Sequence, residues 1–325
     1  MALFIREDDI ARVLRMPDVV AAVEDAFRQA GLGTAVNRPR QRASSGGTIL
    51  HVMSAAIPAL GVMGLKAYSS ARDGTRFLAM LYSTETGELL AVMEADRLGQ
   101  MRTGAASAVA TKYLARPDAG TVGIIGTGWQ ARSQLAAVAC VRPVALVKCY
   151  SRDERRRAAF AEEMIQELGA EVVAAERAEE AVEAEIIITA TTSSEPVLSG
   201  AWLRPGMHVN AIGSNWRQKR ELDTEAVTRA RRIVVDDLEQ AKLEAGDLIQ
   251  PVEEGVLDWE RVVELGPVVA GTEPGRRSAD EITLFESQGI ALEDVAAMKL
   301  AYDRARELGV GEPFRRSASL KGITG

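Results

Sequence analysis

A glycine-rich segment at residues 126–131 has the residue types and the spacing of a dinucleotide-binding turn. It follows the apolar run 122–125 and opens a stretch with helical spacing. Gly126 permits a tight turn, Gly128 lets the backbone approach a pyrophosphate, and Ala131 lets the helix pack closely on the strand. The N–H groups that begin the helix would face the phosphates. The segment therefore predicts a bound dinucleotide, contacted by Gly126, Thr127, Gly128, Trp129, Gln130 and Ala131.

The residues after the second predicted strand of this unit indicate which dinucleotide is preferred. Enzymes that use NAD usually place an acidic residue there to bond the ribose 2′-hydroxyl. This chain has Ser151 and Arg152, with Arg156 behind them, and Asp153 comes late in the turn. Because serine and arginine suit a 2′-phosphate, we expect NADP(H) to be favoured, with NAD(H) possible. The alternative role of the arginines is a solvated helix face.

Two cationic residues precede this segment in apolar surroundings. Lys66 follows the run 61–65, and a lysine there is costly unless it is paired or functional. Arg102 interrupts an alanine-rich stretch and could hold a carboxylate through two parallel hydrogen bonds. From spacing alone, each is more often a surface residue than a functional one.

The composition excludes several classes of protein. The chain has 325 residues and a net charge of −7, with only two histidines and two cysteines. An acidic chain with 5% aromatic residues is a poor nucleic-acid binder. We expect no metal site, no disulfide, no membrane span, and a cytoplasmic protein in which Cys140 and Cys149 are small core residues. His208 is predicted to be structural, within a central strand.

The pattern of elements changes near residue 117. The segment 9–30 predicts two helices, the second beginning near Pro17, and 36–93 is predicted to be rich in strands. An alanine-rich helix is expected at 95–115. Alternating strands and helices from 121 predict a parallel sheet, with elements at 121–125, 130–141, 145–150, 155–168, 171–174, 178–184, 186–190, 207–212 and 232–236. A last long helix is expected at 292–308.

Five ordered motifs together resemble the ornithine cyclodeaminase/mu-crystallin family. They are GLK at 64–66, LGQMRTGAASA at 98–108, GTGWQA at 126–131, AIGSN at 211–215 and DEITLF at 280–285. The resemblance implies an α/β fold in which a Rossmann domain, residues 118–292, is combined with a discontinuous α+β domain, residues 1–117 and 293–325. It also implies that this second domain binds substrate and forms a homodimer.

The same resemblance gives roles to individual residues. Lys66, Arg102 and Arg40, or Arg42 in place of Arg40, match the cations that hold the substrate carboxylate, and Lys66 is also expected to be catalytic. Asn215 stands where cyclodeaminases have a catalytic acid, and His51 stands near their amine-binding Glu. His51 is either a specificity residue or a structural one. Further cofactor contacts are expected from Arg102, Thr103, Thr191, Thr192, Ser193, Gly213 and Ser214.

These matches and departures predict an NAD(P)H-dependent enzyme that acts on a 2-imino acid, preferably a cyclic one such as a pyrroline- or piperideine-2-carboxylate, or on the corresponding amino acid. An amide such as Asn215 cannot act as a base at neutral pH. Ornithine cyclodeamination is therefore the second prediction within this class. A protein that only binds cofactor and a small ligand is the alternative from another class.

Overall fold

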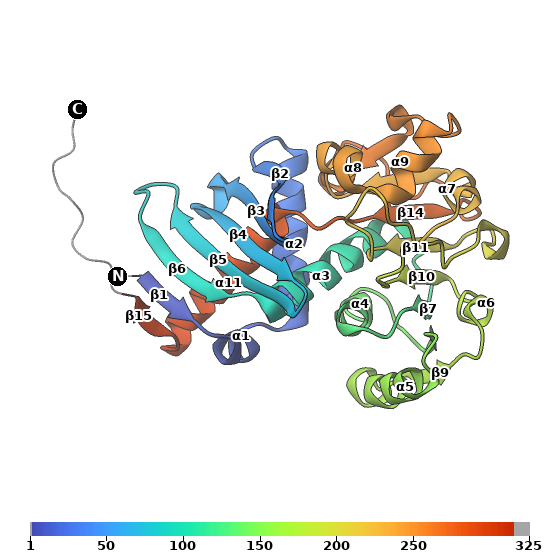
Figure 1. Cartoon of the computed structure of the whole chain (residues 1–325), viewed down its shortest axis with the longest axis horizontal. Helices are drawn as coiled ribbons and strands as arrows, with labels where there is room; N and C mark the ends of the chain where they lie inside the picture. Colours follow the sequence, from blue (N-terminus) through green and yellow to red (C-terminus); the bar gives the residue numbers. More distant parts are fainter. Residues whose placement is uncertain (1, 315–325) are drawn as a thin grey trace.

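The computed structural model describes residues 2–314 and contains two β-sheets joined by a buried helix (Figure 1). The first sheet has seven strands in the order β15-β1-β6-β5-β4-β3-β2. Its strands are β1 (Ala2–Ile5), β2 (Val36–Ser45), β3 (Thr48–Ile57), β4 (Val62–Ala71), β5 (Gly74–Ser83), β6 (Leu89–Glu94) and β15 (Glu312–Phe314).

Strands β2 to β6 form an antiparallel meander whose two faces differ in burial. On β3, His51, Met53 and Ala55 are buried, whereas the residues between them are exposed or half-buried, as the period of two requires. The buried face packs mainly against α11 (Ala291–Leu308), with α3 (Asp96–Leu114) and the short α1 (Glu7–Val13) beside it. A third long helix, α2 (Met16–Gly31), packs on α3 and α11 and completes this helical layer.

The second sheet has eight parallel strands in the order β13-β12-β14-β11-β10-β7-β8-β9. Parallel strands need crossover connections, and helices supply most of them here. The strands are β7 (Thr121–Ile125), β8 (Leu146–Tyr150), β9 (Glu171–Ala174), β10 (Ile186–Thr189), β11 (His208–Ala211), β12 (Arg232–Val235), β13 (Val262–Glu264) and β14 (Thr283–Glu286). The helices are α4 (Trp129–Val138), α5 (Glu154–Leu168), α6 (Ala178–Ala181), α7 (Thr224–Arg229), α8 (Leu238–Glu244), α9 (Gly246–Glu253) and α10 (Leu265–Ala270).

The predicted fold class is confirmed, since an open parallel sheet of Rossmann type stands beside a mixed sheet that the final long helix covers. The helix predicted at 130–141 ends earlier, at Val138, and the one predicted at 178–184 ends at Ala181. The strands β1, β13, β14 and β15 were not predicted; β13 and β15 have only three residues each. Residues 315–325 of the predicted second domain lie outside the described part of the chain.

Helix α3 lies between the two sheets (Figure 1). Nearly every residue from Leu98 to Thr111 is buried, because one side meets α2 and the other meets α4. Gly104 allows the close approach of α4, since a Cβ there would stand 2.3 Å from the carbonyl oxygen of Ser133. This helix brings Arg102 and Thr103 to the space between the sheets. Within residues 2–314, no helix is long and apolar enough to cross a membrane.

Candidate functional site

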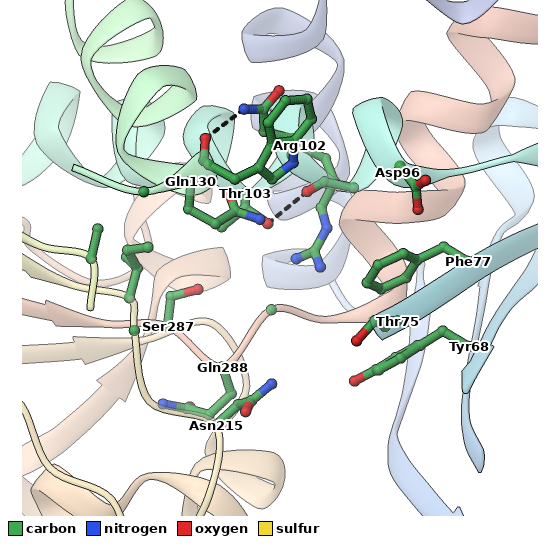
Figure 2. A pocket seen from close by; sticks show the side chains of 18 of the residues that line it. Tyr68, Thr75, Phe77, Asp96, Arg102, Thr103, Gln130, Asn215, Ser287 and Gln288 are labelled. Atoms are coloured by element: carbon green, nitrogen blue, oxygen red, sulfur yellow. Dashed lines mark hydrogen bonds between the residues drawn. The ribbon is translucent and has the colours of Figure 1, made fainter. Parts of the chain in front are cut away.

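A cavity of about 860 Å³ lies between the two sheets, where the carboxyl ends of the parallel strands face the seven-stranded sheet (Figure 2). Ligands of open α/β sheets bind at this end of the strands. The cavity collects residues that are far apart in the sequence. The predicted site residues on its wall are Arg40, His51, Lys66, Arg102, Thr103, Gly128, Trp129, Gln130, Thr191, Thr192, Gly213 and Asn215.

The turn between β7 and α4 has the backbone that a dinucleotide requires. Gly126 has φ +109°, and a Cβ there would stand 2.3 Å from the carbonyl oxygen of Ala190. Gly128 is the N-cap of α4, and a Cβ on it would meet no atom within 4 Å, so its backbone borders open space. The first turn of α4 has no side-chain cap and no acidic residue, which leaves its N–H groups available to an anion. The turn therefore fits a pyrophosphate.

Arg132 of α4 links this turn to Glu163 of α5. Its Nη1 donates to the carbonyl oxygen of Gly128 at 3.0 Å, and its Nε donates to Glu163 at 2.8 Å. Ala131 is fully buried, as expected for the helix–strand contact. Gly126, Thr127 and Ala131 shape the turn but do not line the cavity itself.

The end of β8 carries no acidic side chain aimed at a ribose. Thr127 donates its hydroxyl to Ser151 Oγ at 3.0 Å, so Ser151 lies against the glycine turn. Asp153 is the N-cap of α5 and accepts from the Arg156 N–H at 3.0 Å. Arg152 and Arg156 are exposed beside it. Ser151, Arg152 and Arg156 thus lie outside the cavity wall, at the position that reads the adenosine ribose in this fold.

Lys66 and Arg102 are buried cations that share one acidic pair. Lys66 is 2% exposed and its Nζ is 2.7 Å from Asp294, while Arg102 lies 2.7 Å from Glu293 and 2.9 Å from Asp294. Burial and the neighbouring Arg102 lower the pKa of the Lys66 ammonium to about 8, against the opposing pull of Asp294. The lysine is thus held near the cavity with a proton that it can release close to neutral pH.

Arg40 and Arg42 meet at Glu244 of α8. Arg40 pairs with this carboxylate and also donates to the carbonyl oxygens of Gln288 and Gly289, at 2.9 Å each. Arg42 lies 2.6 Å from the same carboxylate and stacks over Trp216 at 4.3 Å. Arg40 lines the cavity, whereas Arg42 lies behind the wall, so the geometry favours Arg40 as the contact to substrate.

Glu221 holds together two loops that border the cofactor side. Its buried carboxylate accepts from the N–H groups of Thr191 and Gly213, at 2.6 and 2.8 Å, and from the Thr189 hydroxyl at 2.8 Å. This fixes Thr191 and the loop that carries Asn215 at the cavity. Among the predicted contacts, Ser214 and Ser193 point elsewhere: their hydroxyls donate to the carbonyl oxygens of Lys219 and Glu195.

The two histidines have different surroundings. His208 is fully buried in β11, hydrogen-bonded to Thr283 at 2.9 Å and to Asn210 at 3.2 Å, and burial lowers its pKa to about 3. It is structural, as predicted. His51 stacks on Tyr68 at the cavity, and both of its ring nitrogens are buried without a hydrogen-bond partner. Burial, followed by Arg42 and Arg40, lowers its pKa to about 4, so its ring is neutral at neutral pH.

The acids that pair with the cations were missed at the sequence level. Glu244, Glu293 and Asp294 lie 204, 191 and 228 residues along the chain from Arg40, Arg102 and Lys66, so spacing gives no signal. The nearest clue is the acidic pair at the start of an otherwise apolar helix, in ALEDVAAM at 291–298. The prediction for Cys140 was wrong: this thiol is exposed, because α4 ends before it, whereas Cys149 is buried. Among residues 2–314, no group of three or more His, Cys, Asp or Glu side chains could hold a metal.

Comparisons with known proteins agree with this architecture. A Δ¹-pyrroline-2-carboxylate reductase of Bacillus cereus is 39% identical over 270 residues, which are 80% of this chain and 83% of that protein. The solved structure of the Thermococcus litoralis Δ¹-pyrroline-2-carboxylate reductase with NADH and L-proline superposes with a TM-score of 0.91 at 38% identity, covering 96% of this chain and all of that one.

An archaeal alanine dehydrogenase, solved as a dimer with bound NAD, also has a TM-score of 0.91, at 37% identity, and the match covers 97% of this chain and 99% of that one. The model of the ornithine cyclodeaminase/mu-crystallin family matches residues 2–309. With nearly the full length matched, this chain belongs to the ornithine cyclodeaminase/mu-crystallin family.

Proposed function

We propose that this protein is an NAD(P)H-dependent reductase of a 2-imino acid, preferably a cyclic one such as a pyrroline- or piperideine-2-carboxylate, and that it oxidises the corresponding amino acid in reverse. The observation that carries the proposal is the meeting of three buried cations, Arg40, Lys66 and Arg102, with the glycine turn at one cavity. Cations there can hold a carboxylate, and the turn fits a dinucleotide.

The cofactor, when bound, would supply hydride to the imine carbon. The chain's own residues would position that carbon: the guanidinium groups of Arg40 and Arg102 and the ammonium of Lys66 would orient the substrate carboxylate. Lys66 would also hold the proton that the product nitrogen needs, because its lowered pKa allows proton release near neutral pH. The paired acids Glu293 and Asp294 keep the two inner cations fixed in place.

Asn215 argues for the reductase over the cyclodeaminase. It lines the cavity in the loop that Glu221 fixes, but an amide has no basic atom at neutral pH. Reduction of a preformed imine needs no such base. A panel of substrates tests this choice: we expect NAD(P)H oxidation with cyclic imines or with oxo acids plus ammonia. Rapid conversion of ornithine to proline and ammonia without net cofactor turnover would favour the cyclodeaminase, and binding without any turnover would favour a ligand-binding protein.

For the cofactor, we propose that NADPH is preferred although the similar solved structures hold NAD or NADH. The support is the exposed Arg152 and Arg156 beside Ser151 and the use of Asp153 as a helix cap. Arg152→Ala should weaken NADPH binding about tenfold and leave NADH binding nearly unchanged, measured by fluorescence titration. Equal losses for the two cofactors would remove Arg152 from a 2′-phosphate site.

We also propose a homodimer and a cytoplasmic location. The dimer proposal rests on the outer face of the seven-stranded sheet, where Leu50, Val52, Met63 and Leu78 are between 36% and 47% exposed. Such an apolar face is typical of an interface.

The proposed cytoplasmic location rests on two thiols without a disulfide partner. We keep the predicted division into a substrate domain, residues 1–117 and 293–325, and a dinucleotide domain, residues 118–292, as part of this proposal.

A further inference from the structure

Four side chains form one row across the sheet at the cavity. Arg42, His51, Tyr68 and Phe77 stand directly opposite one another on β2, β3, β4 and β5. The His51 and Tyr68 rings are stacked at 4.2 Å and 4°, and the Tyr68 and Phe77 rings lie 4.8 Å apart. Because the rings stack from strand to strand, their edges point away from the sheet. Figure 2 shows Tyr68 and Phe77 projecting into the cavity beside Thr75.

The imidazole of His51 has hydrogen-bonding capacity that the protein does not use. The side chain is 2% exposed, it contributes to the cavity wall, and neither ring nitrogen has a partner. A neutral imidazole offers one donor and one acceptor. Unpaired buried polar atoms are rare because leaving them unpaired is costly. A ligand that meets His51 is therefore expected to carry a group that can hydrogen-bond with it.

The surroundings of His51 hold no unpaired charge. Arg42 pairs with Glu244, donates to the carbonyl oxygen of Asn215 at 3.0 Å and stacks on the Trp216 ring, while its Nε has no hydrogen-bond partner. Tyr68, Ser70 and Thr75 add hydroxyls to the wall, and two further polar lining residues, Arg40 and Asn215, also lie near His51.

The acids of the cavity wall lie elsewhere. Asp96 lies at the far end of the row, near Phe77 (Figure 2), and Glu7 is hydrogen-bonded to its backbone. Glu7 there accepts from the N–H groups of Asp96 and Arg97 that begin α3. An ammonium beside His51 would therefore face Arg42 and Arg40 without a counter-ion of its own, and a second substrate carboxylate would have to compete with Glu244, which both arginines already share. An uncharged polar group suits this end of the cavity best.

We propose that this end of the cavity takes an imino or amino acid whose ring carries an uncharged hydrogen-bonding group, a hydroxyl being the simplest, and that His51 recognises it. This inference rests on the proposed function and names its substrate class. The ring would lie against Tyr68 and Phe77, which supply apolar contact area, and its hydroxyl would pair with His51.

Calorimetry on the NADH-loaded protein tests the subsite, with L-proline and the two epimers of 4-hydroxy-L-proline as probes. We expect one epimer to bind about tenfold more tightly than proline, the size of one net hydrogen bond. His51→Gln, which keeps a neutral donor and acceptor, should retain this preference. His51→Leu, of similar volume, should lose it, and unchanged NADH binding by both variants shows that they are folded.

Three results overturn the proposal: proline binding at least as tightly as both epimers, a preference that survives His51→Leu, or no binding of any of the three at millimolar concentration. Turnover separates this from the proposed function. If the hydroxyl preference is measured but no imine is reduced by NADH or NADPH, the subsite stands and the reductase fails. If cyclic imines are reduced without any hydroxyl preference, the reductase stands and the role of His51 fails.

Discussion

Lys66 is a cation in an environment very different from water. It lies on β4 and faces α3 and α11. Its charge is balanced by Asp294 at 2.7 Å, and Arg102 lies close by. Burying a cation is tolerated only with such a partner, and removal of either member is costly. The arrangement keeps a proton on a nitrogen that gives it up easily, which a surface lysine does not do.

This environment predicts a pH dependence. Because burial and Arg102 lower the pKa of Lys66 to about 8, the ammonium form predominates below pH 8 and is lost above it. The kcat/KM for imine reduction should therefore be level below pH 8 and fall about tenfold for each further pH unit. Lys66→Arg, which stays charged, should have low activity without this break, and Lys66→Ala should lose at least about a hundredfold in kcat/KM with NAD(P)H affinity nearly intact. A wild-type profile that stays level to pH 10 would contradict the role of Lys66.

At the scale of elements, the two glycines in the turn between β7 and α4 have different roles: Gly126 allows the fold of the turn, and Gly128 borders the space for the cofactor. Gly126 adopts a left-handed backbone against the Ala190 carbonyl, whereas Gly128 has φ −85° and borders open space. Gly126→Ala should destabilise the fold by at least about 1–3 kcal/mol, because the residue is both strained and crowded. Gly128→Ala should leave the melting temperature unchanged but weaken dinucleotide binding at least about tenfold, since its methyl group enters the space for the phosphates. Tight cofactor binding by Gly128→Ala would place the pyrophosphate elsewhere.

The loops after β10 and β11 depend on a single carboxylate. Glu221→Gln replaces one accepting oxygen with a donor that faces the N–H of Thr191 or Gly213, which should cost about 1–3 kcal/mol in the free energy of unfolding and raise KM. Glu225→Gln, on the exposed side of α7, is the matched control and should change neither quantity. Chemical denaturation and steady-state kinetics measure both. A stable Glu221→Gln protein with normal KM would show that the loops hold their places without this carboxylate.

The sequence predicts these elements unevenly, for physical reasons. Local signals placed the long helices and the glycine turn, because each depends on neighbours within a few residues, whereas the short helices α8, α9 and α10 were not predicted. The apolar surroundings of Lys66 and Arg102 made them candidates, and the family resemblance gave them their expected roles. Their partners Glu293 and Asp294 could not be predicted, because a pair that forms across the fold leaves no periodic trace. The same holds for the stack of His51 on Tyr68, which depends on the register of two strands.

At the scale of the whole molecule, the outer face of the seven-stranded sheet remains uncovered within residues 2–314. Its inner face is covered by α2, α3 and α11, whereas the outer face presents Val52 and Met63 to solvent in the single chain. Val52→Lys combined with Met63→Lys should convert a dimer to a monomer in sedimentation velocity, because buried unpaired charges oppose association. Val173→Lys, on the edge strand β9 of the other sheet, is the control and should leave the mass unchanged. A wild-type monomer, or a double variant that stays dimeric, would exclude this face as the interface.

The position of α11 also has a consequence for synthesis. This helix is translated after all eight strands of the parallel sheet, yet it carries the two acids that neutralise Lys66 and Arg102, made about 190 to 230 residues earlier. Until it is made, part of the inner face of the seven-stranded sheet is bare and two cations lack their counter-charges. Long-range closure of this kind slows folding. The nascent chain can complete its dinucleotide-binding sheet first, so the substrate end of the cavity becomes functional only after α11 has been made.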